Sequence, residues 1–134
     1  MPFPAASFDV VPCRLAPPHF DSVPAFLAEA ARVLVPAGRL LIADTTVRDG
    51  DPELDQWQDR VERLRDPSHR RSYSPAEWTA FLTQAGFSIS EIDSVSGFVP
   101  ITLNAWLAKA GCTRAAQPSA VPYTHPTPPT RQPV

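Results

Sequence analysis

The chain has 134 residues, of which 43% are hydrophobic, so it has the size of one domain and enough apolar side chains for a core. Its formal charge of −2 is spread along the sequence without a basic stripe, which excludes nucleic acid and anionic membrane surfaces as expected partners. No stretch approaches the ~20 apolar residues of a membrane span, and no signal segment opens the chain, so we expect a cytoplasmic protein.

Cysteine and histidine positions argue against a metal centre or a disulfide framework. The two cysteines, Cys13 and Cys112, lie far apart and form no C-x-x-C pattern. His19, His69 and His125 have no metal-ligand spacing between them or with the cysteines. We therefore expect no metal site and a reduced Cys13.

The first half of the chain alternates strand and helix signals. Residues 8–13 are a short apolar run that predicts a strand, and Ser22 and Pro24 then begin a helix in which apolar residues recur at helical spacing. Residues 35–38 end this helix, and residues 39–44 form a nearly continuous apolar run that is typical of a strand in a parallel sheet. A strand, a helix and a second strand in this order predict a βαβ unit and an α/β fold.

Two further helices are predicted after the second strand. Asp51 and Pro52 begin the first, which carries an apolar stripe formed by Leu54, Trp57, Val61 and Leu64. Residues 74–77, Ser-Pro-Ala-Glu, form a capping box that begins the next helix, and Gly86 ends it.

The signals are weaker in the last third of the chain. Residues 87–95 predict a strand with an irregular register, and residues 103–110 predict a short last helix. The composition then becomes rich in proline and loses its apolar periodicity. We expect one domain over residues 1–111 and a disordered tail over residues 112–134.

Polar and ring-constrained residues follow both strands of the predicted βαβ unit. Residues 13–20 read Cys-Arg-Leu-Ala-Pro-Pro-His-Phe, and residues 44–46 read Asp-Thr-Thr. Ligands of open α/β sheets bind beyond the carboxyl ends of the strands. Because parallel neighbours end at the same edge of a sheet, we expect both segments to face a ligand there.

Four sequence features occur in an order that resembles a known enzyme family. They are SFDVVPCRLAPPHF at residues 7–20, RVLVPAGRLL at residues 32–41, DPSH at residues 66–69 and a S-x-x-E-W helix start at residues 74–78. Over about residues 3–111, they resemble the carboxyl-terminal part of a class I S-adenosylmethionine-dependent methyltransferase of the type-11 or ubiquinone/menaquinone-biosynthesis-like kind. The resemblance implies a partial Rossmann-like methyltransferase fold, a three-layer sandwich that lacks the first strands.

The resemblance implies roles for residues after the first strand. Cys13, Arg14, Leu15 and Ala16 would border the methionine end of the cofactor, S-adenosylmethionine. His19 is the candidate general base, because a neutral imidazole accepts a proton near pH 7. A histidine that caps the next helix or fills a loop is an alternative with at least equal support.

The resemblance also implies an acceptor pocket. Asp44 at the end of the second strand, with Arg71 and Tyr73 before the capped helix, would line the pocket of a small organic methyl acceptor. For Arg71 and Tyr73 we favour the alternative interpretation, a surface ion pair and a packing aromatic side chain.

The chain departs from the family pattern in ways that bear on its activity. It has five glycines but no G-x-G motif, whereas the family holds its cofactor with a glycine-rich turn and an acidic residue after the first two strands. Pro12 cannot donate to a sheet ladder, which favours an edge position for its strand. Pro18 and Ala37 stand where relatives usually carry a histidine and a glycine.

These departures leave two hypotheses. The first is a methyltransferase that acts on a small organic acceptor with S-adenosylmethionine and is expected to be inactive as this chain alone. The second is a non-catalytic remnant or interaction module that binds protein through an exposed sheet edge. In either case we expect the open edge to lead to a homodimer, to pairing with a complementary amino-terminal fragment, or to aggregation.

Overall fold

The structure is a computed structural model that describes residues 1–93. Along the chain it contains the elements β1 (Phe8–Arg14), the 3-10 helix η1 (Pro17–His19), α1 (Val23–Val33), β2 (Leu34–Ala43), α2 (Pro52–Arg65) and α3 (Pro75–Gln84). This order confirms the predicted strand, helix, strand and two further helices. The helix predicted at residues 103–110 and the proline-rich tail lie outside the described residues. Within residues 1–93, no helix is long and apolar enough to cross a membrane.

The first two α-helices begin with the side chains that the sequence marks as N-caps. The Ala25 N–H donates to Oγ of Ser22 at 3.2 Å at the start of α1, and the Leu54 N–H donates to Oδ1 of Asp51 at 3.1 Å at the start of α2. Each bond satisfies a backbone donor that has no partner within the helix. Local sequence therefore decides where both helices begin.

Helix α3 has the predicted capping box and the predicted glycine end. The Glu77 N–H donates to Oγ of Ser74 at 3.3 Å, and the Ser74 N–H donates to Oε2 of Glu77 at 3.0 Å. At the other end, Gly86 adopts a φ of +83° and its N–H donates to the Thr83 carbonyl at 3.1 Å. This left-handed end is one that glycine enters without strain.

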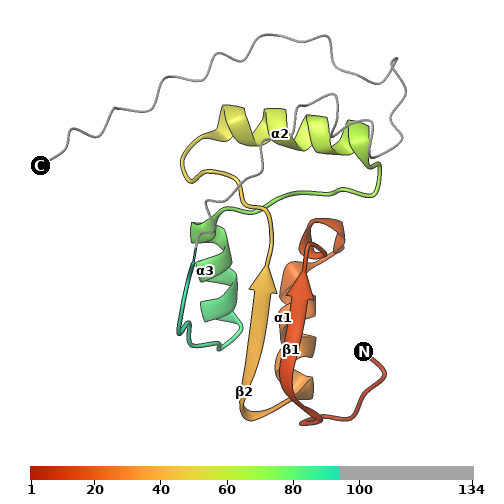
Figure 1. The fold of residues 1–134 in the computed structure, drawn as a ribbon, viewed down its shortest axis with the longest axis vertical. Helices are drawn as coiled ribbons and strands as arrows, with labels where there is room; N and C mark the ends of the chain where they lie inside the picture. Colours follow the sequence, from red (N-terminus) through yellow and green to blue (C-terminus); the bar gives the residue numbers. More distant parts are fainter. Residues whose placement is uncertain (94–134) are drawn as a thin grey trace, which may run out of the picture.

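Strands β1 and β2 pair in parallel, and α1 connects them, which confirms the predicted βαβ unit. Cys13 is paired with Ile42, and Arg14 is paired with Ala43. The two strands therefore end side by side, and the segments that follow them leave the sheet at one edge. Figure 1 shows α2 lying beyond the arrowheads of both strands, at this same edge.

At its beginning the pairing is irregular. Phe8 is paired with Leu34 but Val10 is paired with Arg39, so residues 35–38 form a bulge in β2. The sequence places a turn at these residues and begins the strand at residue 39, whereas β2 begins at Leu34 directly after α1. The backbone turns here within the paired strand, because a bulge accommodates extra residues without ending the ladder.

The hydrophobic core lies between β2 and the helices α1 and α3. Leu27 is 0% exposed and Trp78 is 8% exposed, and the β2 side chains of Leu40 and Ile42 pack against their cluster. Because Leu40 and Ile42 are two residues apart, they point to the same face of the strand. Helices α1 and α3 thus pack on one face of β2. Figure 1 shows α3 beside β2 and α1 behind β1.

The opposite face of the sheet is more open within the described residues. The side chain of Leu41 is 55% exposed and that of Val10 is 45% exposed, although both are strand residues with apolar side chains. Pro12 pairs with Leu41 and is exposed as well. In the described part of the chain β1 has β2 as its one neighbour, so Pro12 lies in an edge strand, where the missing N–H donor is tolerated.

The strand predicted at residues 87–95 does not form in the part of it that the structure describes. Residues 87–93 have no strand structure, and residues 94 and 95 of the predicted strand lie outside the described part. The side chain of Ile92 is 67% exposed, so this segment lacks the burial that favours a strand. The α2 stripe is also only partly buried, since Val61 is 4% exposed while Trp57 is 42% exposed.

Candidate functional site

The candidate site is built at the carboxyl ends of β1 and β2. Helix η1 follows β1 and carries His19, and the segment after α2 runs back against it. The Arg70 N–H donates to the carbonyl of Pro18 at 2.7 Å, which anchors this returning segment to η1. Two parts of the chain that are far apart in sequence therefore share one surface.

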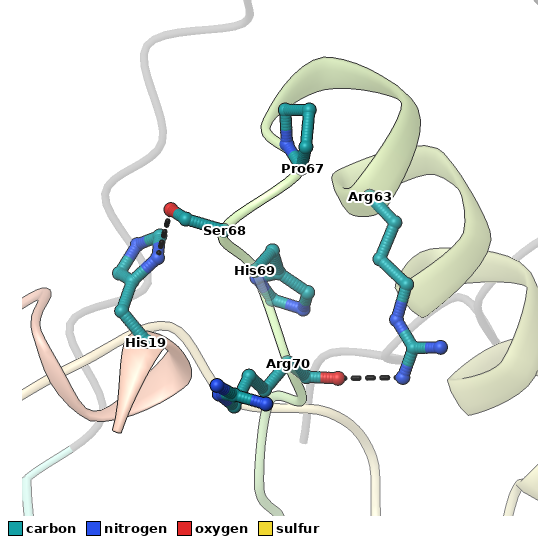
Figure 2. A pocket seen from close by; sticks show the side chains of 6 residues that line it. All are labelled: His19, Arg63, Pro67, Ser68, His69 and Arg70. Carbon is teal, nitrogen blue, oxygen red and sulfur yellow. Dashed lines mark hydrogen bonds between the residues drawn. The ribbon is translucent and has the colours of Figure 1, made fainter. Parts of the chain in front are cut away.

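A turn at residues 66–69, Asp-Pro-Ser-His, brings a hydroxyl group to His19. Oδ1 of Asp66 accepts from the Ser68 N–H at 2.9 Å and from the Ser68 hydroxyl at 2.7 Å. Oγ of Ser68 also lies 2.9 Å from Nδ1 of His19. The two bonds of Ser68 hold the pKa of the Asp66 carboxyl below its ordinary value. Figure 2 shows Ser68 directed toward the His19 ring.

His69, the last residue of this turn, is buried beside His19. Its side chain is 3% exposed, and Nε2 lies 3.2 Å from Oδ1 of Asp59 on α2. The rings of His19 and His69 meet edge to face, with 6.1 Å between their centroids. Each histidine thus has an oxygen partner of its own, a hydroxyl for His19 and a carboxylate for His69.

Asp44 leaves β2 at the same edge. Its Oδ1 accepts from the Thr45 N–H at 2.9 Å, whereas its Oδ2 is buried and has no hydrogen-bond partner among the described residues. Burial raises the pKa of this carboxyl, while the Thr45 N–H and the two nearby histidines, His19 and His69, lower it in part. Burial, with a contribution from Asp44, also raises the pKa of the Cys13 thiol. Cys13 is therefore favoured as a thiol and not as a thiolate.

The segment Cys13–Ala16 leaves the sheet through a strained residue. Leu15 adopts a φ of +51° and its side chain is 49% exposed, while its N–H donates to the Ala43 carbonyl at 2.9 Å. A leucine in the left-handed region is uncommon, and such strain concentrates at ligand sites. Arg14 is exposed, and Ala16 is partly buried directly before η1. The signal for this strain is absent from the sequence, because leucine does not mark a left-handed turn.

A pocket of about 510 Å³ opens between η1 and the end of α2. Figure 2 shows the side chains that line it, which are polar or basic apart from one proline. They are His19, Arg63, Pro67, Ser68, His69 and Arg70. The Arg63 guanidinium donates to the Arg70 carbonyl at 2.6 Å and lies 3.3 Å from Oδ2 of Asp59. Of the predicted site residues, His19 is the one that lines this pocket.

Arg71 and Tyr73 do not line this pocket. The Arg71 guanidinium lies 2.8 Å from Oε1 of Glu77 and 3.4 Å from Oδ2 of Asp55. The Tyr73 ring packs edge to face against Phe81, with 5.3 Å between centroids, and also against Trp78 at 5.8 Å. These are the surface ion pair and the packing aromatic that the sequence offers as alternatives.

Several residues of this surface follow no sequence motif that would assign them a role. Asp66, Ser68 and His69 are the DPSH segment, which the sequence singles out only as part of a family resemblance. Asp59 and Arg63 lie on the charged side of α2 and carry no local signal that distinguishes them from other exposed charges. Within residues 1–93, no group of three histidine, cysteine or acidic side chains is arranged to hold a metal ion.

Comparison with known proteins finds relatives among methyltransferases. The family profile described as "Methyltransferase domain" matches residues 1–42. The uncharacterized methyltransferase YcgJ of Bacillus subtilis is 38% identical over 111 residues, which are 83% of this chain and 43% of YcgJ. The 2-methyl-6-phytyl-1,4-hydroquinone methyltransferase of Synechocystis is 35% identical over 108 residues, 78% of this chain and 34% of that protein.

Solved structures agree with these relatives. The crystal structure of YcgJ superposes with a TM-score of 0.78 at 36% identity and covers 87% of this chain and 48% of YcgJ. BH2331 of Bacillus halodurans C-125, a methyltransferase candidate, has a TM-score of 0.79 at 32% identity, over 87% of this chain and 53% of BH2331. This chain spans about half the length of these solved neighbours. The parallel βαβ unit, the methyltransferase relatives and the matching folds lead to one conclusion: over about half of their length, this chain is related to the class I S-adenosylmethionine-dependent methyltransferases, and it has a partial Rossmann-like fold.

Proposed function

We propose that this chain forms the acceptor side of a methyltransferase that transfers the methyl group of S-adenosylmethionine to a small organic molecule. The observation that supports this most is the pocket at the carboxyl ends of β1 and β2, where His19 meets the turn at residues 66–69. Ligands of open α/β sheets bind at this edge. The similarity to YcgJ and to the Synechocystis enzyme, both described as methyltransferases, supports methyl transfer as the reaction class.

In this proposal His19 is the general base, and Asp44, which leaves β2 at the same edge but does not line that pocket, borders the acceptor. The imidazole removes a proton from the acceptor atom as that atom attacks, and Asp44 offers its unpartnered Oδ2 to a polar group of the acceptor. The cofactor supplies an already activated methyl group when it is bound. The protein then acts mainly by holding the acceptor in line, and such positioning can contribute on the order of 7–11 kcal/mol.

The residues of this chain fit one end of the cofactor but do not hold all of it. Cys13–Ala16 lie at the correct edge of the sheet, with the backbone of Leu15 held in a strained conformation. No G-x-G turn occurs in the sequence to approach the cofactor closely. We therefore propose that Cys13–Ala16 border the methionine end and that this chain alone is inactive.

Calorimetric titration with S-adenosylhomocysteine tests the proposal. We expect no saturable heat from the 134-residue chain, and saturable binding when the chain is fused to the part of YcgJ that it does not match. In the fusion, His19→Gln is expected to retain cofactor binding but to lose methyl transfer to a small acceptor. A folded fusion that binds no S-adenosylhomocysteine would overturn the proposed function, and saturable binding to the chain alone would overturn its proposed inactivity.

A second candidate function is protein binding through the exposed edge of the sheet and the open face beside it. Its support is that β1 is an edge strand within residues 1–93, and that Val10 of β1 and Leu41 of β2 are 45% and 55% exposed. Sedimentation of the purified chain over a range of concentrations tests this candidate. A concentration-dependent dimer that Leu41→Lys dissociates would support it, and a monomer at all concentrations would exclude self-association.

A further inference from the structure

We propose that Ser68 and Asp66 are positioning residues that fix His19 in one tautomer, with its proton on Nδ1 and its free lone pair on Nε2. Two hydrogen bonds meet at the Ser68 hydroxyl group, and their directions determine this tautomer. The tautomer follows from the contacts of this chain alone, whereas the catalytic use of Nε2 rests on the proposed function.

The Ser68 hydroxyl has a single hydrogen to donate. Oγ of Ser68 lies 2.7 Å from Oδ1 of Asp66, a distance in the range of charge-assisted O–H···O⁻ bonds. An ionised carboxylate can only accept, so the hydroxyl hydrogen must lie between Ser68 and Asp66. The lowered pKa of Asp66 keeps this carboxyl ionised at neutral pH.

Oγ of Ser68 then presents a lone pair, and not a hydrogen, to His19. Its contact with Nδ1 at 2.9 Å is a hydrogen bond only if Nδ1 carries a proton. A neutral imidazole has one proton, so Nε2 is left as the acceptor. Nε2 is thus the nitrogen able to take a proton from a bound molecule.

The backbone holds this arrangement in place. The His69 N–H donates to the Asp66 carbonyl at 2.9 Å, and the Asp66 N–H donates to the Glu62 carbonyl at 2.7 Å at the end of α2. The Arg70 N–H reaches the Pro18 carbonyl at 2.7 Å, one residue before His19. Main-chain bonds therefore hold the turn to α2 on one side and to η1 on the other, and they keep Ser68 within reach of His19.

Nitrogen-15 NMR of histidine-labelled protein reads the tautomer directly and requires neither cofactor nor activity. Spectra are recorded at about pH 8.5, above the ordinary histidine pKa of ~6.5, and the His19 signals are assigned by their loss in His19→Gln. We expect the Nδ1–H tautomer to dominate for His19 in the unmodified chain. A dominant Nε2–H tautomer would overturn the proposal.

Substitutions test whether the hydrogen bonds from Asp66 through Ser68 to His19, and not packing alone, fix the tautomer. Ser68→Ala removes the acceptor of the Nδ1–H bond, and Asp66→Ala frees the Ser68 hydroxyl to donate to Nδ1, so each should reverse the dominant tautomer. Ser68→Thr and Asp66→Asn retain the hydroxyl and the acceptor oxygen, so each should keep the Nδ1–H form. Ser90→Ala, an exposed serine outside the site, is the matched control and should change nothing.

The outcomes distinguish this proposal from the proposed function. If one of the alanine variants fails to fold, the other and the two conservative variants still decide, because chemical-shift dispersion reports folding in the same samples. If the Nδ1–H form of His19 persists in a folded alanine variant, Ser68 and Asp66 do not fix the tautomer and the proposal is wrong. Loss of cofactor binding by the YcgJ fusion would refute the methyltransferase proposal and leave the tautomer result unaffected.

Discussion

Oγ of Ser68 lies 2.9 Å from Nδ1 of His19, although 49 positions separate the two residues along the chain. The contact joins the helix that follows β1 to the turn that follows α2, and a main-chain bond from Arg70 to Pro18 supports it. Each segment alone is a short stretch with ordinary turn residues. The pocket exists because the tertiary structure brings both segments together beyond the ends of two parallel strands.

Replacing Ala37 by glycine should stabilise the protein. Ala37 adopts a φ of +64° in the bulge of β2, a conformation that costs an L-residue with a Cβ roughly 1–2 kcal/mol. The greater freedom of glycine in the unfolded chain offsets part of this gain, so we expect a net increase of about 0.5–1 kcal/mol in the free energy of unfolding. Urea denaturation measures it. The matched control is Ala31→Gly, at an exposed helical position of α1, which should instead destabilise by ~1 kcal/mol.

Truncating a core leucine should cost far more than truncating a leucine on the open face. Leu27 is 0% exposed beneath the sheet, and we expect Leu27→Ala to lower the free energy of unfolding by about 2–5 kcal/mol. Leu41 is 55% exposed, so Leu41→Ala should change it by about 0.5 kcal/mol. Thermal and urea unfolding of both variants give the comparison. Equal losses would mean that another surface covers Leu41 in solution.

Removing the cap of α3 should weaken that helix measurably. Oγ of Ser74 accepts the Glu77 N–H at 3.3 Å, and this backbone donor has no partner within the helix. We expect Ser74→Ala to lower the free energy of unfolding by about 1 kcal/mol. Ser74→Asp should keep most of the original stability, because aspartate is also a good N-cap. Ser88→Ala, at an exposed position after α3, is the control in the same urea titrations. No loss in Ser74→Ala would show that solvent replaces the cap.

The stability contribution of Asp44 should depend on pH in a defined direction. Burial raises its pKa above the ordinary value of 3.8, so the folded protein binds this proton more tightly than the unfolded chain does. The contribution of Asp44 to the free energy of unfolding is fully present below pH 3.8. It is lost as the pH rises through the raised pKa of the folded protein. Asp44→Asn should therefore gain stability relative to the original chain on going from about pH 3 to about pH 7. A melting-temperature difference that is the same at both pH values would contradict this.

Sequence alone determined the elements whose causes are local. Ser22, Asp51 and Ser74 mark the beginnings of the three α-helices because a capping side chain reaches a backbone donor only two or three residues away. The apolar runs around Val11 and Leu41 predicted two neighbouring parallel strands, since a strand, a helix and a strand in succession have few ways to pack. The placement of His19 and Asp44 at one edge follows from that topology.

Other features depended on which side chains meet in three dimensions. For Tyr73 the sequence left two roles open, an acceptor-pocket residue and a packing aromatic, and favoured the second. In the structure its ring packs against Trp78 and Phe81 of α3, a contact that no local sequence pattern specifies. The strand expected at residues 87–95 does not form in residues 87–93, where apolar side chains such as Ile92 have little burial. Tertiary structure alone brought Ser68 to His19, because a hydrogen bond across 49 positions leaves no periodicity or spacing in the sequence. The main-chain bond from Arg70 to Pro18, which joins the segment after α2 to η1, holds the two side chains together.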